Sequence, residues 1–291
     1  MGMDHTPLLA YLRAHIDELE TIALSSNRIL RLPWEGGRCI VKQEHRKPEE
    51  RSPFWFAMDY IFQSNFASQR RSVAALAPAL CNPHIPVAGV ICTDETLKVQ
   101  VFEEMEGRGY APDTFPEDEG VLYQLGQYLG FLHGRSWPAF GCWPSAEQPA
   151  ASFGQRLLEA MESILERYWQ GDERAWTQFR AIRGSIPAPT AFHLMMTDLS
   201  ANQFVYDEGL HAIRGVVDLD AYVVGPREWE LTILELCLPE GSAFRRGYER
   251  YGALPDLSGC RDVYRFFSYL CDPWERADLS EFLARPKLLE R

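Results

Sequence analysis

The stretch from Phe192 to Asp220 decides the fold of this 291-residue chain: FHLMMTDLSANQFVYDEGLHAIRGVVDLD. Two apolar runs flank the turn sequence Asp207-Glu208-Gly209, which is typical of a β-hairpin. Asp198 stands just before the first strand, and Asp218 stands at the end of the second. Because antiparallel pairing brings those two ends side by side, we expect the two carboxylates to lie close together.

Other oxygen-bearing side chains accompany this pair. Asp220 lies on the same side of the strand as Asp218 by two-residue alternation, and Asn202 and Gln203 follow Asp198 in the turn. Carboxylate and amide oxygens are hard ligands that suit Mg²⁺, with phosphate oxygens completing its shell. Taken singly, each carboxylate could equally be a cap or a surface charge, and Asn202 could simply shape its turn.

The N-terminal third predicts a small antiparallel sheet. Short β-like runs cover residues 21–24, 29–33 and 38–43, separated by the polar turn Ser25–Arg28 and by Gly36-Gly37, which suits a tight hairpin. The third run ends in Lys42. The chain has four lysines among 29 basic residues, so a lysine ending a buried strand indicates a point charge for phosphate. A solvated edge-strand lysine is the alternative.

Helical spacing dominates the rest of the chain. The predicted helices cover residues 8–19, 54–76 (as one or two helices), 120–134, 153–169, 172–183, 229–238 and 259–269. Residues 85–92 and 97–102 predict another strand pair. We therefore expect an α+β chain, with an antiparallel β lobe over residues 1–107 and a mostly helical lobe over residues 108–291 that contains the hairpin.

The composition excludes several classes of function. Acidic residues outnumber basic ones 41 to 29, so the net charge of −12 argues against nucleic-acid binding and against an anionic membrane surface. No apolar run approaches a membrane span, and the acidic, amphipathic N-terminus is not a secretory signal. The seven cysteines include no C-x-x-C pair, which favours reduced thiols in the cytoplasm.

The order of these parts resembles the aminoglycoside phosphotransferase/choline kinase family, which are small-molecule kinases with a protein-kinase-like fold. The resemblance rests on the strand ending Val41-Lys42, the acidic hinge with Met105-Glu106-Gly107, Asp198 followed by an amide, and the sequence V-V-D-L-D that ends at Asp220. It covers residues 20 to about 240 and implies a two-lobed kinase-like fold.

The resemblance also implies ATP- and Mg²⁺-dependent phosphoryl transfer to a hydroxyl of a small-molecule acceptor. Asp198 matches the catalytic aspartate, and Gln203, Asp218 and Asp220 match metal-binding positions. The nucleotide would be held by residues at three places: the turn between the first two strands, the third strand, and the hinge. They are Ser25, Ser26, Asn27, Lys42, Glu103 and Met105.

Three positions depart from the family pattern. Met196 stands at the usual histidine, Gln203 stands at the usual asparagine five residues after Asp198, and Gln69 stands where a glutamate usually pairs with the lysine. Asn202, one residue early, is the alternative metal ligand to Gln203. The lysine's carboxylate partner could be Glu44, Glu49 or Asp59. These departures motivate the alternative hypothesis of a pseudokinase that binds nucleotide or a partner without turnover. A metal-dependent hydrolase is a third reading, but it leaves Lys42 without a role.

The charge distribution bears on the acceptor. After residue 107 the chain has 18 basic and 27 acidic residues, and an acidic lobe favours a cationic acceptor such as an aminoglycoside or a choline-like amine. Trp229, Glu230, Trp274 and Glu275 could form an aromatic and acidic amine site. We expect His193 to be a core histidine and His133 to cap a helix end.

Overall fold

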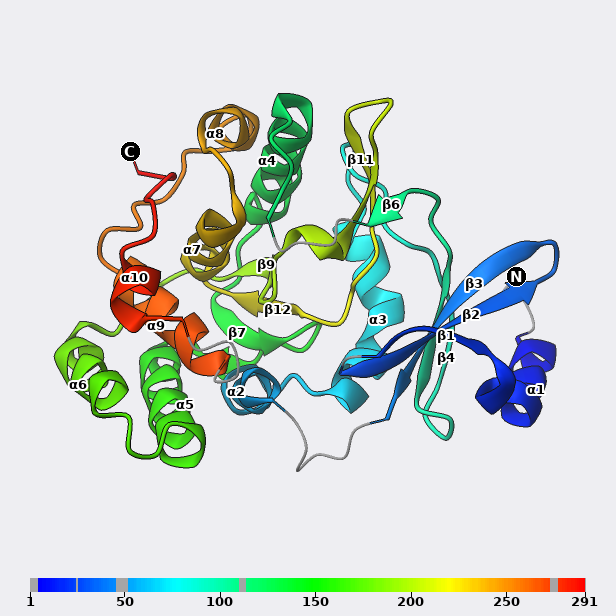
Figure 1. Cartoon of the computed structure of the whole chain (residues 1–291), viewed down its shortest axis with the longest axis horizontal. Coiled ribbons are helices and arrows are strands. Elements are labelled where there is room, and N and C mark those ends of the chain that lie inside the picture. The colour runs from blue at the N-terminus through cyan, green and yellow to red at the C-terminus, as the bar shows by residue number, and fades with distance from the viewer. Residues whose placement is uncertain (1–4, 25, 46–51, 110–113, 273–276, 291) are drawn as a thin grey trace.

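The computed structural model describes residues 5–24, 26–45, 52–109, 114–272 and 277–290. A β-rich part and a mainly helical part lie side by side, with helix α3 (Phe66–Leu80) between them (Figure 1). Among these residues, no helix is both long and apolar enough to cross a membrane.

The β-rich part is a five-stranded antiparallel sheet in the order β1-β2-β3-β5-β4. Its strands are β1 (Glu20–Leu24), β2 (Asn27–Trp34), β3 (Gly37–Glu44), β4 (Val90–Asp94) and β5 (Val99–Glu103). Apolar side chains on one face of β2, β3 and β5 pack against helix α1 (Thr6–His15) and the turn η1 (Ile16–Glu18). Because side chains alternate along a strand and Val41 lies in this packed face, Lys42 points to the opposite face.

A tight turn fixes the register of β2 against β3. Trp34 pairs with Gly37, which leaves Glu35 and Gly36 as a two-residue turn with φ of 46° and 81°. Both angles lie in the left-handed region that glycine adopts without strain, as the hairpin prediction requires. This register places Lys42 between Ile29 on β2 and Gln100 on β5, in the middle of the sheet.

The predicted helical segment 54–76 forms two helices. Helix α2 (Pro53–Phe62) ends at Gln63, which adopts a left-handed φ of 55°. Helix α3 then begins after Asn65, whose side chain accepts from the backbone N–H of Ser68 while the Ser68 hydroxyl interacts with the Asn65 backbone. This reciprocal capping explains why the chain starts a second helix there.

The predicted strand over residues 85–92 is wrong in its first half. Only its second half joins the five-stranded sheet, as part of β4. Before that, Ala88 N donates to Val216 O at 3.0 Å and Val216 N donates to Pro86 O at 2.9 Å. Residues 86–88 therefore cross to the helical part and bond the end of the second strand of its hairpin, at Val216.

The helical part contains most of the predicted helices with shifted ends. These are α4 (Glu119–His133), α5 (Phe153–Tyr168), α6 (Glu173–Ile182), α7 (Arg227–Cys237) and α9 (Arg261–Cys271). The prediction missed two short helices, α8 (Ser242–Tyr248) and α10 (Leu279–Leu283), because seven and five residues carry little periodicity. Short 3-10 turns precede α5 and follow α6, as η3 (Ala150–Ser152) and η4 (Arg183–Ser185), and a third, η5 (Ala201–Gln203), leads into the strand that begins at Phe204.

Two small sheets lie in the helical part. One has the order β11-β10-β6 and the other β8-β7-β12-β9. Their strands are β6 (Arg108–Gly109), β7 (Ala139–Cys142), β8 (Gln148–Pro149), β9 (His193–Met196), β10 (Phe204–Asp207), β11 (Ala212–Val216) and β12 (Tyr222–Gly225). The predicted hairpin is β10–β11. Its second strand ends at Val216, so Asp218 and Asp220 lie in the loop after it and not on the strand, as alternation had placed them.

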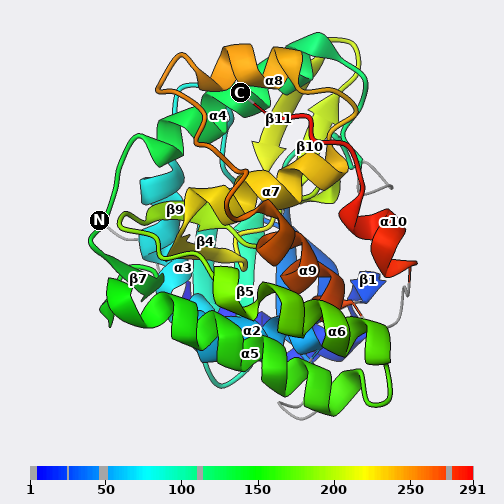
Figure 2. The ribbon, with the colours of Figure 1, turned by 90° about the vertical axis from the view of Figure 1, so that its left-hand side faces the viewer.

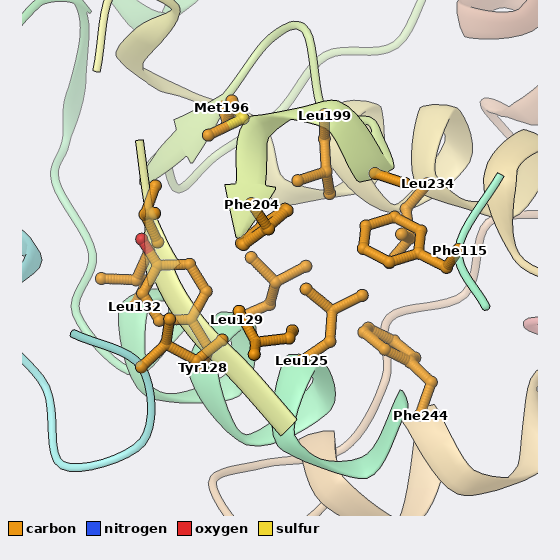
Figure 3. Packing of buried hydrophobic residues seen from close by; sticks show 14 of the residues in the cluster. Phe115, Leu125, Tyr128, Leu129, Leu132, Met196, Leu199, Phe204, Leu234 and Phe244 are labelled. Carbon is orange, nitrogen blue, oxygen red and sulfur yellow. The ribbon is translucent and has the colours of Figure 1, made fainter. Parts of the chain in front are cut away.

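Two hydrophobic clusters share α7 and fill the helical part. One lies between α3, α4, α7, α8 and the hairpin, and Figure 3 shows Met196, Leu199 and Phe204 within it. The other lies between α2, α5, α6, α7 and α9. Figure 2 shows α4 with α8 on one side of α7 and α5 with α6 on the other. Helices α4 and α8 can approach closely because Gly126 and Gly247 have no side chain. A Cβ atom at either position would collide with the backbone of the facing helix.

Candidate functional site

The turn after β9 places Asp198 at the surface of a pocket. Both the backbone N–H and the hydroxyl of Thr197 donate to the carbonyl oxygen of Ala221, each at 2.9 Å. The side-chain amide of Gln203 donates to the Asp198 carbonyl oxygen at 3.2 Å. The backbone of Asp198 is thus held on both sides while its side chain stays exposed.

Lys42 connects the five-stranded sheet to the loop after β11. Its Nζ lies 2.7 Å from Asp218 Oδ1 and 2.7 Å from Asp220 Oδ2. The side chains of Lys42 and Asp220 are only 7% and 4% exposed, whereas that of Asp218 is 34% exposed. The alternative of a solvated edge-strand lysine is wrong, because β3 is an inner strand and the ammonium is buried between carboxylates.

Burial and charge act against each other on the pKa values of this cluster. Burial alone would lower the pKa of Lys42, but the charges of Asp218 and Asp220 outweigh burial and raise that pKa. For Asp220, burial is the largest influence and raises its pKa, although Lys42 opposes the shift. Lys42 therefore stays a cation at neutral pH.

The cluster fits a small, hard cation. Asp220 Oδ1 is buried and has no hydrogen-bond partner among the residues described, while the backbone N–H of Asp220 donates to Asp218 Oδ1 at 3.1 Å. A buried carboxylate oxygen without a partner is costly, and a bound Mg²⁺ would satisfy it. Within the described ranges, no group of three or more His, Cys, Asp or Glu side chains is arranged to hold a metal. The two aspartates would therefore need further oxygen ligands from an amide, a phosphate or water.

The structure separates the two candidate amide ligands. Gln203 is buried and bonded to the Asp198 segment. Asn202 is exposed, and its Oδ1 accepts from the Ser200 hydroxyl at 2.6 Å, which shapes the turn. Of the two, Gln203 has the inner position.

A buried hydrogen-bond network holds the backbone at Met196. The Met196 side chain lies in the hydrophobic cluster (Figure 3). Its backbone N–H donates to Glu230 Oε1 at 2.6 Å, and Glu230 Oε2 lies 2.6 Å from His133 Nε2. The other ring nitrogen of His133 bonds the Tyr248 hydroxyl at 2.8 Å. The prediction that His133 caps a helix is thus wrong, because its ring is turned into the core.

His193 is a core histidine, as expected. Its Nδ1 bonds the carbonyl oxygen of Arg135 at 2.9 Å. Burial, together with the nearby charges of His133 and Arg227, lowers its pKa to about 4, so the ring is neutral at physiological pH.

The predicted partners of Lys42 bond elsewhere. Glu44 Oε2 accepts from Arg70 Nη1 at 3.0 Å, and Asp59 Oδ1 accepts from the Asn65 side chain at 3.0 Å. Gln69 donates to the Ser64 hydroxyl at 3.2 Å. Glu49 lies outside the described residues. The carboxylates that pair with Lys42 are therefore Asp218 and Asp220, and α3 is attached to β3 through the Arg70–Glu44 ion pair instead.

The turn between β1 and β2 reaches the same cluster. Asn27, predicted as a turn residue, is the first residue of β2, and its Nδ2 donates to Asp220 Oδ2 at 2.9 Å. The Ser26 hydroxyl accepts from Trp55 Nε1 at 2.8 Å. Ser25 lies outside the described residues.

The backbone N–H groups at the end of β5 bond two neighbouring segments. The N–H of Glu103 donates to Gly89 O at 2.9 Å, and the N–H of Glu104 donates to Arg38 O at 3.0 Å. For the N–H of Met105, the described residues provide no hydrogen-bond partner. The Met105 side chain packs so closely on β11 that a Cβ on Gly215 would collide with it.

A pocket of about 740 Å³ opens beside Asp198. Aromatic rings form much of its wall: Phe54, Trp55, Trp229, Phe267 and Phe282. Its charged lining residues among those described are Asp198, Asp272 and Arg285. The amine site predicted from Trp229 and Glu230 is therefore wrong in part: Trp229 lines the pocket, but Glu230 is buried in the network behind Met196. Trp274 and Glu275 lie outside the described residues.

Comparison with known proteins identifies relatives over most of the chain. The model of the family described as the phosphotransferase enzyme family matches residues 20–267. A comparison with curated protein sequences gives no match.

Three solved structures illustrate the likeness. The macrolide 2'-phosphotransferase MphH from Brachybacterium faecium is 16% identical, with a TM-score of 0.54 over 89% of this chain and 87% of that one. The choline kinase LicA from Streptococcus pneumoniae is 13% identical, with a TM-score of 0.57 over 91% and 88%. The ADP-bound aminoglycoside phosphotransferase APH(2'')-Ib is 14% identical, with a TM-score of 0.58 over 98% and 99%. At these identities the likeness shows the fold, and it confirms the predicted α+β, kinase-like class.

Proposed function

Because this chain belongs to the phosphotransferase enzyme family, we propose that it transfers the γ-phosphoryl group of ATP to a hydroxyl of a small-molecule acceptor, with Mg²⁺ as cofactor. Family membership confirms the predicted resemblance and makes the chain a small-molecule phosphotransferase. The nucleotide, the metal, the acceptor and the roles of individual residues belong to the proposal.

The observation that supports the proposal most is the position of Lys42. A buried ammonium from the sheet lies 2.7 Å from two aspartates of the other part of the molecule, and one aspartate oxygen has no partner among the described residues. Phosphoryl transfer needs this set of charges: a cation for the phosphates, and carboxylates for the metal that neutralises developing charge.

Each residue then has a defined task. Asp218 and Asp220 would hold Mg²⁺, with Gln203 as an amide ligand, and the bound metal would neutralise charge on the phosphate oxygens. Lys42 would bind the phosphates once it leaves the aspartates. Asp198 would orient the acceptor hydroxyl and accept its proton.

The adenine would lie against the hinge. The N–H of Met105 supports this, because no backbone bond among the described residues uses it and a base needs such a donor. Glu103, at the end of β5, and Ser26 and Asn27, at the β1–β2 turn, would contact the rest of the nucleotide.

The acceptor would occupy the pocket beside Asp198. Its aromatic wall and its mixture of two carboxylates with one guanidinium suit a molecule with an apolar face and a polar or cationic group. All seven cysteines are free thiols, which supports a reducing, cytoplasmic location.

Binding and turnover can be tested separately. Thermal melts with ATP and ADP, with and without Mg²⁺, should show a Mg²⁺-dependent rise in Tm for wild type that disappears in Asp218→Ala. An acceptor screen that starts with amines and amino sugars should then show phosphoryl transfer, lowered about 10²–10⁴-fold in Asp198→Asn without loss of nucleotide binding.

Other outcomes would point to other functions. A Tm rise without transfer to any acceptor, and unchanged by Asp198→Asn, would favour the pseudokinase. Phosphate release from small esters without nucleotide would favour the hydrolase. The absence of any rise at millimolar nucleotide would refute ATP dependence.

A further inference from the structure

Two consecutive residues of the β1–β2 turn bond two different sites. Ser26 accepts a hydrogen bond from the indole N–H of Trp55 at 2.8 Å. Asn27 donates to Asp220 Oδ2 at 2.9 Å and is buried. The turn is therefore fixed at one residue to α2 and at the next residue to the carboxylate cluster.

Trp55 is a rigid anchor for the turn. Its ring is 9% exposed and packs against Phe66 and Phe54, with ring centroids 4.7 Å and 5.0 Å away. It lies in the first turn of α2, which Ser52 caps by accepting from the Trp55 backbone N–H. Helix α2 packs on α5, α9, β7 and β12, so Trp55 belongs to the hydrophobic core of the helical part.

The same tryptophan lines the pocket beside Asp198. Ser26, Phe54 and Trp55 line this pocket together with Asp198. One indole therefore contacts the space where an acceptor would lie and also holds the turn that borders the phosphate-binding cluster. No other described bond from the pocket's aromatic wall reaches the β1–β2 turn.

We propose that Trp55 is a positioning residue that couples the acceptor pocket to the β1–β2 turn through its hydrogen bond to Ser26. This inference rests on the proposed function, because it assigns the turn to nucleotide phosphates. An acceptor packed on Trp55 fixes the indole, the fixed indole holds Ser26, and the held turn keeps Asn27 over the metal-binding aspartates. By linkage, a nucleotide that fixes the turn favours the acceptor to the same extent.

The size of the coupling follows from the bond. One neutral hydrogen bond of this kind changes an equilibrium by about 3–10-fold. The link is therefore a modest coupling between two sites and not a switch.

Four variants isolate the bond. Trp55→Phe keeps a ring in the wall and removes the N–H. Ser26→Ala removes the acceptor oxygen, whereas Ser26→Thr keeps a hydroxyl. The double variant Trp55→Phe/Ser26→Ala tests whether both single variants act by removing the same hydrogen bond, in which case their effects do not add. Trp176→Phe, on α6 away from the pocket, is the matched control for a tryptophan-to-phenylalanine change.

The first measurement is amide hydrogen exchange in the ligand-free protein. We expect faster exchange at residues 26–28 in Trp55→Phe and Ser26→Ala, no further increase in the double variant, and wild-type exchange in Ser26→Thr and Trp176→Phe. Unchanged exchange in both single variants would overturn the inference without reference to any ligand.

The second measurement compares MgATP binding and turnover in the same variants. It gives the Kd for MgATP, and the kcat and KM for MgATP hydrolysis, in which water is the acceptor. Trp55→Phe and Ser26→Ala should each raise the MgATP Kd and KM about 3–10-fold, and the double variant should raise them no further. Ser26→Thr keeps the hydroxyl and should therefore lose less MgATP affinity than Ser26→Ala. Additive losses, or equal losses in Ser26→Thr, would overturn the link. If wild-type protein binds no MgATP, the proposed function fails and the coupling fails with it, whereas wild-type binding with unaffected variants refutes the coupling alone.

Discussion

Replacing Glu230 by alanine should destabilise the protein by about 3–6 kcal/mol. Glu230 is fully buried, and its two oxygens hold Met196 N and His133 Nε2, each at 2.6 Å. Each donor left without a partner in the core costs about 1–3 kcal/mol, and the lost side-chain volume adds a cavity. Against a total stability of about 5–15 kcal/mol, this change removes a large fraction.

Glu230→Gln tests which part of the effect comes from the unsatisfied donors. The amide keeps the shape and one acceptor for Met196 N–H, so we expect a loss of only about 1–2 kcal/mol. Tyr248→Phe removes the hydroxyl at the far nitrogen of His133 and should cost about 1 kcal/mol.

Urea denaturation with unchanged m-values measures these differences. In the same variants, phosphoryl transfer should lose kcat more than MgATP affinity, since Met196 stands two residues before Asp198. The reasoning is refuted if the unfolding free energy of Glu230→Ala lies within about 1 kcal/mol of the wild-type value, or if Glu230→Gln loses as much stability as Glu230→Ala. In either case the network does not hold the segment that contains Met196.

Three further predictions concern other buried charges. Because the pKa of His193 is near 4 in the folded protein, the folded ring stays neutral between pH 6.5 and 4, where the unfolded ring binds a proton. The free energy of unfolding should therefore fall by up to about 1.4 kcal/mol per pH unit as the pH drops through this range. His193→Gln should lose this slope, and parallel plots of unfolding free energy against pH for the two proteins would contradict the prediction. Arg265 is buried against Glu235 at 2.7 Å and also donates to three carbonyl oxygens between residues 283 and 286, so Arg265→Met should cost about 3–5 kcal/mol and expose the C-terminal segment to protease first; simultaneous cleavage throughout would contradict it. Lys42→Met should lower Tm by leaving Asp220 without its cation, and MgCl₂ should raise the Tm of this variant more than that of wild type; equal shifts would contradict the metal site.

The local patterns in the sequence were sufficient for the β10–β11 hairpin and for most of the longer helices. The turn at residues 207–209 and the apolar runs around it predicted the β10–β11 hairpin, and helical spacing predicted α4, α5, α6, α7 and α9. These features depend on neighbouring residues, because turn conformation and one-sided burial are set within a few positions along the chain. The division at residue 107 stays a prediction.

The candidate site was predictable only in part. The sequence singled out Lys42, Asp218 and Asp220 as site residues, and in the structure the lysine lies 2.7 Å from both aspartates. The role of each residue stays a prediction. The partner of Lys42 was expected on its own lobe, at Glu44 or Asp59, and the structure gives both of those other partners. The sequence offered Glu230 as part of an amine site, whereas in the structure it is buried and bonds the backbone of Met196 and the ring of His133.

The sequence by itself therefore determined most of the longer helices, the central hairpin, the kinase-like order of parts and the charged residues available for chemistry. Only the tertiary structure decided which of them meet. Lys42 lies 176 residues from Asp218, Trp55 lies 29 from Ser26, and Met196 lies 34 from Glu230. Contacts over such separations depend on how whole elements pack, and a periodic pattern records that an element is buried without recording what it is buried against.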